Sequence, residues 1–103
     1  MGKKITKEMI KKIMKFKKEI NVERVILFGS YARGKANKDS DLDIVLVGKK
    51  FRNKDIMSRY KGLWLKWTLD LPVDFIAYTP EEFEKLSKQV SIVSEALKEG
   101  IEI

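Results

Sequence analysis

The sequence predicts an α/β (α+β) fold in which helices flank one small mixed β-sheet. Three observations favour this fold. Apolar residues repeat at helical spacing near the N-terminus, three short β-branched runs follow, and helix-capping signals recur in the C-terminal third. The chain has 103 residues, which we expect to form one domain spanning residues 1–103.

The first half of the chain predicts one helix and two strands. Residues 7–20 form an amphipathic pattern, and Thr6 is a suitable N-cap. The face expected to be buried carries Met9, Ile13, Phe16 and Ile20. Residues 23–28, "ERVILF", predict a strand that ends at Gly29, and residues 41–47, "DLDIVLV", predict a second strand. Between them, residues 30–35 have room for one helical turn.

The middle of the chain predicts a polar loop, "GKKFRN", and then a second long helix over residues 54–69 with Asn53 as its cap. Two tryptophans lie on this segment, and their spacing favours packing in the core over stacking on a ligand.

A third strand, "PVDFIAY", is predicted over residues 72–78. Thr79 and Glu82 form a capping box that opens a helix reaching about residue 88. A last helix is expected to run to Glu99 with Gly100 as its C-cap, and the closing "IEI" suits an edge strand.

Composition restricts the chemistry available to the chain. Cysteine and histidine are both absent, which excludes disulfides, Cys or His zinc sites, thiolate nucleophiles and Ser-His-Asp triads. Lys and Arg number 22 against 15 Asp and Glu, a net charge of +7 that favours anionic partners. The basic N-terminus has no apolar signal segment, so we expect a cytoplasmic protein without a membrane partner.

Two of the predicted strands carry carboxylates where apolar residues would be expected. Asp41 and Asp43 open the second strand two residues apart, so they should project from one face, and Asp74 interrupts the third. If the two strands are neighbours, the three carboxylates converge. Such a set suits two Mg²⁺ ions, with Asp74 also placed to accept a proton. The alternative is structural, with Asp41 in a turn and Asp43 paired with a lysine.

The turn after the first strand is the second half of the candidate site. Gly29 allows close approach of the backbone, and Ser30 with the following amides can bind a phosphate. Arg33 and Lys35 are near enough to neutralise a triphosphate, and the alternative is that either is simply a solvated side chain. A P-loop is rejected, because Ala36 stands where a Ser or Thr should hold Mg²⁺ and a strand follows instead of a helix.

The segment "GSYARGKANKDSDLDIVLV" resembles the signature of the DNA polymerase β nucleotidyltransferase superfamily. The resemblance is strongest to the minimal nucleotidyltransferase (MNT) proteins of that superfamily. The resemblance implies a polymerase β-like fold, a nucleoside triphosphate and two Mg²⁺. It assigns the metal to Asp41, Asp43 and Asp74, and the phosphates to the Gly29-Ser30 turn.

The resemblance also implies a biological role. Such proteins are often antitoxins that pair with a HEPN-family toxin, and some transfer AMP from ATP to a tyrosine of that toxin. Two alternatives remain open: a non-catalytic antitoxin that neutralises its toxin by stoichiometric binding, and transfer to RNA or a small molecule. Nucleic acid as a partner is not favoured. Self-association into a homo-oligomer through an exposed Tyr31 and the terminal "IEI" is a further possibility.

Overall fold

A computed structural model describes residues 2–103 of the chain. Its elements, in chain order, are α1 (Lys7–Ile20), β1 (Arg24–Phe28), β2 (Leu42–Val47), the 3₁₀ helix η1 (Lys49–Phe51), α2 (Ile56–Tyr60), α3 (Leu63–Lys66), β3 (Val73–Tyr78), α4 (Pro80–Ser87), α5 (Ile92–Glu99) and β4 (Ile101–Glu102).

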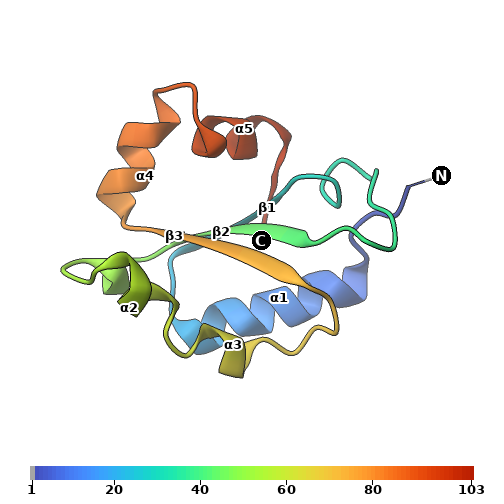
Figure 1. Cartoon of the computed structure of the whole chain (residues 1–103), viewed down its shortest axis with the longest axis horizontal. Coiled ribbons are helices and arrows are strands. Elements are labelled where there is room, and N and C mark those ends of the chain that lie inside the picture. Colours follow the sequence, from blue (N-terminus) through green and yellow to red (C-terminus); the bar gives the residue numbers. More distant parts are fainter. Residues whose placement is uncertain (1) are drawn as a thin grey trace.

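The four strands form one mixed sheet in the order β3-β2-β1-β4. β2 is antiparallel to β1 and parallel to β3, while β4 is antiparallel to β1. Helices α1 and α3 lie on one face of the sheet, and α4 and α5 lie on the other (Figure 1). The predicted mixed sheet flanked by helices is therefore confirmed, as is the edge strand at the C-terminal end.

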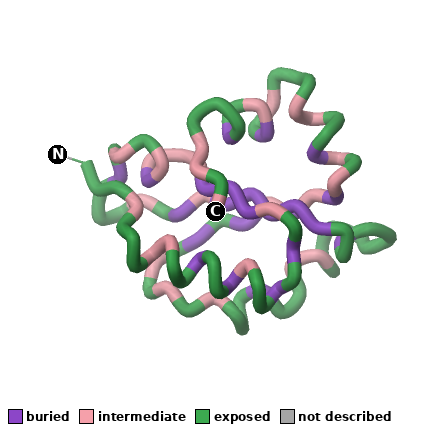
Figure 2. Tube along the Cα trace, turned by 180° about the vertical axis from the view of Figure 1, so that it is seen from behind, coloured by how far each residue is buried: buried purple, intermediate pink, exposed green. Residues whose placement is uncertain are grey.

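Each face of the sheet packs on its own set of apolar residues, because alternate strand residues point to opposite sides. Leu42, Ile44 and Leu46 of β2 join Ile13 and Phe16 of α1 on one face. A second list of buried residues belongs to the other face: Ile26, Val45, Val47, Phe83, Val93 and Ala96. Buried positions accordingly run along the strands between the two helical layers (Figure 2). This alternation decides which strand residues reach the α4–α5 face.

The helix caps predicted at Thr6 and Thr79 are present. The Thr6 hydroxyl accepts the N–H of Met9 at 3.1 Å and opens α1. At α4, the Thr79 hydroxyl accepts the N–H of Glu82 at 3.1 Å, and the Glu82 carboxylate accepts the N–H of Thr79 at 2.9 Å. Each bond satisfies a backbone group that the first helical turn leaves without a partner.

The single long helix predicted over residues 54–69 is wrong. The segment folds as two short helices, α2 and α3, separated at Gly62, whose φ is +82°. Its cap is also different, because the Asp55 carboxylate accepts the N–H of Ser58 at 2.8 Å and Asn53 lies outside the helix at φ +61°. The left-handed backbone at Gly62 ends the helical path even though the apolar spacing continues across it.

Two smaller expectations are also corrected. The "GKKFRN" segment contains η1, and its Phe51 is 1% exposed, so the apolar side chain anchors this lysine-rich stretch in the core. Tyr31, expected at the surface for self-association, is 4% exposed and belongs to the core on the α1 side. None of the helices within residues 2–103 has the length and apolar character needed to span a membrane.

Candidate active site

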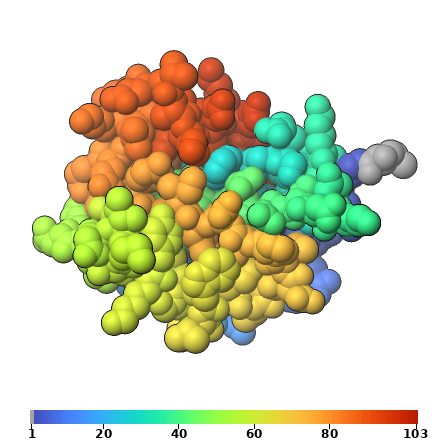
Figure 3. Space-filling view, in the orientation of Figure 1, coloured from blue at the N-terminus to red at the C-terminus, as the bar shows by residue number. Residues whose placement is uncertain are grey.

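Three parts of the chain meet at one end of the sheet. β1 ends there, and both antiparallel β2 and its parallel neighbour β3 begin there. The backbone register pairs Phe28 with Asp43 and Asp43 with Asp74. Asp43 and Asp74 are thus neighbours on adjacent strands and project from the same face, the one carrying α4 and α5. In the space-filling view, the turn after β1 borders β3 on the visible face (Figure 3).

The three predicted carboxylates differ in exposure. Asp43 is partly buried, whereas Asp74 and Asp41, which directly precedes β2, are exposed. Within the described chain, none of the three side chains forms an ion pair or a hydrogen bond. The structural alternative, a lysine paired with Asp43, therefore has no such pair to support it in residues 2–103.

Asp43 is the carboxylate of the site whose pKa is shifted by its surroundings. Burial, and then the negative charges of Asp74 and Asp41, raise the pKa of the Asp43 carboxyl above its ordinary value, while Arg33 opposes the shift. The folded protein thus holds negative charges close enough to repel one another. A cation or a proton at this position would relieve the repulsion.

The donor set is suited to a hard divalent cation, because carboxylate oxygens are the ligands that Mg²⁺ prefers. No three acidic side chains among residues 2–103 are already arranged so that they could hold a metal ion by themselves. Mg²⁺ is commonly held by one or two carboxylates together with phosphate oxygens of the substrate. The residues present fit such a shared site, in which the substrate completes the coordination.

The turn after β1 is built around Gly29. Its φ is +78°, and a Cβ at this position would lie 2.3 Å from Oδ2 of Asp43. The sequence suggested that Gly29 allows a ligand to approach the backbone. The structure shows in addition that glycine is needed to make room for the carboxylate of Asp43.

One helical turn follows Gly29, as the sequence predicts. The N–H of Arg33 donates to the carbonyl of Gly29 at 3.1 Å, and that of Lys35 donates to the carbonyl of Ser30 at 2.9 Å. Among residues 2–103, no protein acceptor is found for the backbone N–H groups of Ser30, Tyr31 and Ala32, and none for the Ser30 hydroxyl. These groups form a set of donors beside the carboxylates.

Arg33 has a partner that sequence reasoning did not find. Its Nη1 donates to Oε2 of Glu99 in α5 at 3.1 Å, and both side chains are about half exposed. The pair connects the turn to α5. Arg33 is also close enough to Asp43 for its positive charge to lower the pKa of the Asp43 carboxyl. No sequence signal could have identified Glu99, because the two residues lie 66 positions apart.

Comparisons with known proteins identify the family of the chain. The family described as "Nucleotidyltransferase domain" matches residues 7–103. The chain is 32% identical over 102 residues to the "Putative protein adenylyltransferase MJ0141" of Methanocaldococcus jannaschii, covering 93% of this chain and 99% of that protein. It is 49% identical over 35 residues to MJ0604 of the same organism, which has the same printed description, covering 34% of this chain and 35% of that protein.

The fold has a counterpart among solved structures. A crystal structure described as "a putative nucleotidyltransferase from Sulfolobus solfataricus" superposes with a TM-score of 0.62, at 23% identity, over 92% of this chain and 78% of that one. At this identity the likeness concerns the fold alone. The family match, by contrast, covers nearly the whole chain and includes both the turn and the strand-borne carboxylates. The chain therefore belongs to the nucleotidyltransferase domain family and is a transferase with a nucleotide substrate.

Proposed function

We propose that this protein is a Mg²⁺-dependent adenylyltransferase that moves AMP from ATP to a tyrosine hydroxyl of a HEPN-family toxin, and so acts as the antitoxin of the pair. The observation that carries the proposal is the register pairing of Asp43 with Asp74, beside the turn at Gly29 and Ser30. A nucleotide phosphate held there would lie between donors on one side and carboxylates on the other.

The carboxylates have two roles in this proposal. Asp41, Asp43 and Asp74 would share the metal with the phosphates of the nucleotide. Bound there, Mg²⁺ supplies charge neutralisation for the phosphates and for the departing pyrophosphate. The raised pKa of Asp43 supports this role, because the repulsion that raises it is what a cation removes. Asp74 is the exposed carboxylate near the start of β3. An acceptor hydroxyl can reach it from solvent, and Asp74 would accept the proton of that hydroxyl.

The turn would position the leaving group. The hydroxyl of Ser30 and the free N–H groups at the head of the turn would donate to the β- and γ-phosphates, and Arg33 adds positive charge nearby. The acceptor oxygen then forms a bond to the α-phosphorus while the bond to the pyrophosphate breaks. The proton passes to Asp74, and the pyrophosphate leaves towards the turn. Catalysis of this kind depends on positioning and charge neutralisation.

The choice of a protein acceptor rests on the relatives. The Methanocaldococcus proteins named above carry a description as protein adenylyltransferases, and the longer match covers both chains almost fully. The HEPN toxin as acceptor rests on the resemblance to minimal nucleotidyltransferases. Cytoplasmic location and the antitoxin role belong to the same proposal.

The test is transfer of label from α-labelled ATP to the toxin encoded beside this protein, in the presence of Mg²⁺. The expected result is one labelled tyrosine on the toxin and loss of its activity at substoichiometric amounts of this protein. Asp43→Asn and Asp74→Asn should abolish labelling. Asp70→Asn, which removes an exposed carboxylate in the loop before β3, is the matched control and should label normally.

Two outcomes would contradict the proposal. Label that never reaches the toxin, although ATP is bound, would exclude transfer to this acceptor. Full neutralisation without nucleotide, only at a one-to-one ratio and equally by Asp43→Asn, would show that the protein acts by stoichiometric binding.

A further inference from the structure

A cavity of about 550 Å³ lies at the outer edge of β3, between α2 and α4. The two helices flank the end of β3 that leads into α4 (Figure 1). Its apolar and aromatic wall is formed by Ile56, Tyr60, Ile76, Tyr78 and Leu86. A volume and lining of this kind are typical of sites for small organic ligands.

The base of this cavity is held by hydrogen bonds. Arg59 donates to both carboxylate oxygens of Glu82, at 2.6 and 3.0 Å, and to the carbonyl of Ala77 at 3.1 Å. The N–H of Ala77 donates to the hydroxyl of Tyr60 at 3.1 Å. Because the charges of Arg59 and Glu82 satisfy each other, the cavity offers an apolar surface better suited to a flat ring than to a phosphate.

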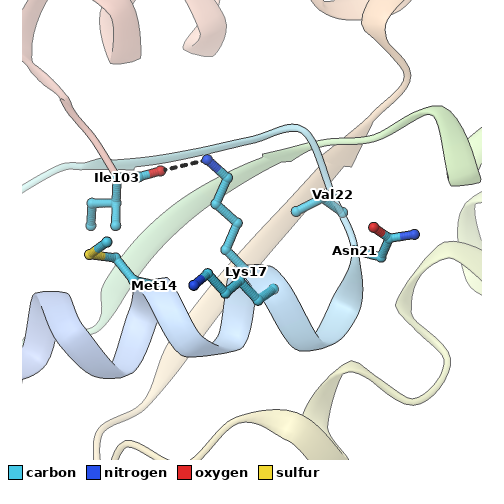
Figure 4. Close-up of a pocket in the computed structure, with 6 residues that line it drawn as sticks. Met14, Lys17, Asn21, Val22 and Ile103 are labelled. Atoms are coloured by element: carbon cyan, nitrogen blue, oxygen red, sulfur yellow. Dashed lines mark hydrogen bonds between the residues drawn. The ribbon is translucent and has the colours of Figure 1, made fainter.

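The cavity lies on the same strand as one of the carboxylates. Asp74, Ile76 and Tyr78 alternate along β3 and share the face that carries α4 and α5. Ile76 is therefore about 6.8 Å along the strand from Asp74, a span that a pentose could bridge. A second hollow, lined by residues that include Met14, Lys17 and Ile103, lies at α1 on the other face (Figure 4). It cannot share a ligand with the carboxylates.

The sheet order gives a nucleotide its direction in this site. β1 and its phosphate-binding turn lie on one side of β2, and β3 lies on the other. With the outer phosphates at the turn and the α-phosphate at Asp43, the nucleoside extends towards β3. We propose that the cavity between α2 and α4 holds the purine base of the nucleoside triphosphate. The inference rests on the proposed function and assigns a location to the half of the substrate that the carboxylates and the turn do not contact.

Two features favour the base over the acceptor protein as the occupant. Tyr78 is half-buried and offers an aromatic ring to a stacked base, while Lys85 and Gln89 place hydrogen-bonding groups at the rim. Asp74 is exposed, so an acceptor hydroxyl can reach it from solvent without entering the cavity.

The test compares the binding of ATP and of inorganic tripolyphosphate, each with Mg²⁺, by titration calorimetry. Ile56→Trp places a large ring at the cavity wall, and Tyr78→Leu removes the stacking surface. Met57→Trp is the matched control, because Met57 is the next residue of α2, is 83% exposed and does not line the cavity. We expect both cavity variants to lower ATP affinity by roughly tenfold or more, the scale of one stacked base. Tripolyphosphate affinity should stay unchanged in all three variants, which also shows that each is folded.

The inference is overturned if the parent protein binds ATP no more tightly than tripolyphosphate, or if both cavity variants bind ATP as the parent does. It is also overturned if the variants keep ATP affinity but lose transfer to the toxin, since the cavity would then belong to the acceptor. Binding that follows the expected pattern without any transfer contradicts the proposed function and leaves the base site standing.

Discussion

The carboxylate of Asp43 occupies the space beside Gly29 that a side chain at residue 29 would need. The Oδ2 atom would lie 2.3 Å from a Cβ built on that glycine. The turn and the carboxylate of Asp43 are therefore packed against each other, so a side chain at residue 29 would displace that carboxylate.

Gly29→Ala should damage both the fold and the site. The substitution places a Cβ at φ +78° and against Asp43, so we expect a loss of about 1–2 kcal/mol from backbone strain and a further ~1–3 kcal/mol from overpacking. Chemical denaturation measures the stability, and transfer from ATP measures the site.

The matched control for this change is Gly62→Ala. Gly62 has nearly the same backbone angle, φ +82°, but no atom lies within 4 Å of a Cβ built there. It should lose only the strain component and keep transfer activity. Equal losses of stability for the two variants would show that the contact with Asp43 carries no weight.

Asp43→Asn should stabilise the metal-free protein at neutral pH while abolishing transfer. The pKa of Asp43 is raised in the folded state, so its ionised form destabilises the fold above that raised value and has no effect below the ordinary value near 3.9. The variant should therefore melt a few degrees higher than the parent at pH 7. The advantage should disappear as the pH falls towards the ordinary value. Melting curves of both proteins at several pH values, with Asp70→Asn as the control, decide this.

The secondary structure was predictable where local signals were strong. The capping groups of α1 and α4 and the alternation along β2 and β3 each act within a few residues, so they can be read from the sequence. The sequence left the pairing of β2 with β3 as a condition, because bringing Asp74 beside Asp43 is a functional argument and not a local signal. The burial of Tyr31 and Phe51 was not predicted, because each lies in a short polar stretch with basic residues, where burial depends on tertiary packing.

The break between α2 and α3 and the partner of Arg33 escaped prediction for different physical reasons. Gly62 interrupts a segment whose apolar spacing suits one long helix, and the two short helices still direct their apolar residues to the same core. The partner of Arg33 comes from a distant helix, and the cavity beside β3 exists only because α2 and α4 flank that strand. Neither the Arg33–Glu99 pair nor the cavity produces a periodic pattern in the sequence from which it could be predicted.

Adding Mg²⁺ and ATP together should raise the melting temperature of the parent protein. A ligand present at a hundred times its Kd stabilises the folded state by about 2.7 kcal/mol, provided it does not bind the unfolded chain. Asp43→Asn and Asp74→Asn should lose most of this gain, and chelation by EDTA should remove it from the parent. Equal stabilisation of the parent and of both variants by Mg²⁺ and ATP would place the metal elsewhere.

Breaking the bond between Arg33 and Glu99 should affect ligand binding more than stability. Both side chains are about half exposed, and pairs of this kind contribute about 0.2–1 kcal/mol. Glu99→Gln frees Arg33 and should tighten tripolyphosphate binding, whereas Arg33→Gln should weaken it. Calorimetry at two salt concentrations tests this, because the effect should shrink as salt screens the charges. If both variants bind tripolyphosphate as the parent does, Arg33 has no role in phosphate binding.

The pair of Arg59 and Glu82 should be a structural anchor of the region between α2 and α4. The Arg59 side chain is 10% exposed and also donates to the carbonyl of Ala77. Arg59→Met should cost about 1–3 kcal/mol, because it leaves that carbonyl without its donor and leaves the half-exposed Glu82 carboxylate with only the N–H of Thr79. Arg52→Met is the matched control, since Arg52 pairs with Glu81 at the surface and its replacement should change the denaturation midpoint little.

The bond to Arg59 also lowers the pKa of Glu82. The stabilisation from the Arg59–Glu82 pair is therefore present at neutral pH and is lost as the pH falls through that lowered value. Denaturation of both variants at pH 7 and in acid measures these differences. If Arg59→Met changes the midpoint as little as Arg52→Met does, the Arg59–Glu82 pair does not hold the cavity wall in place.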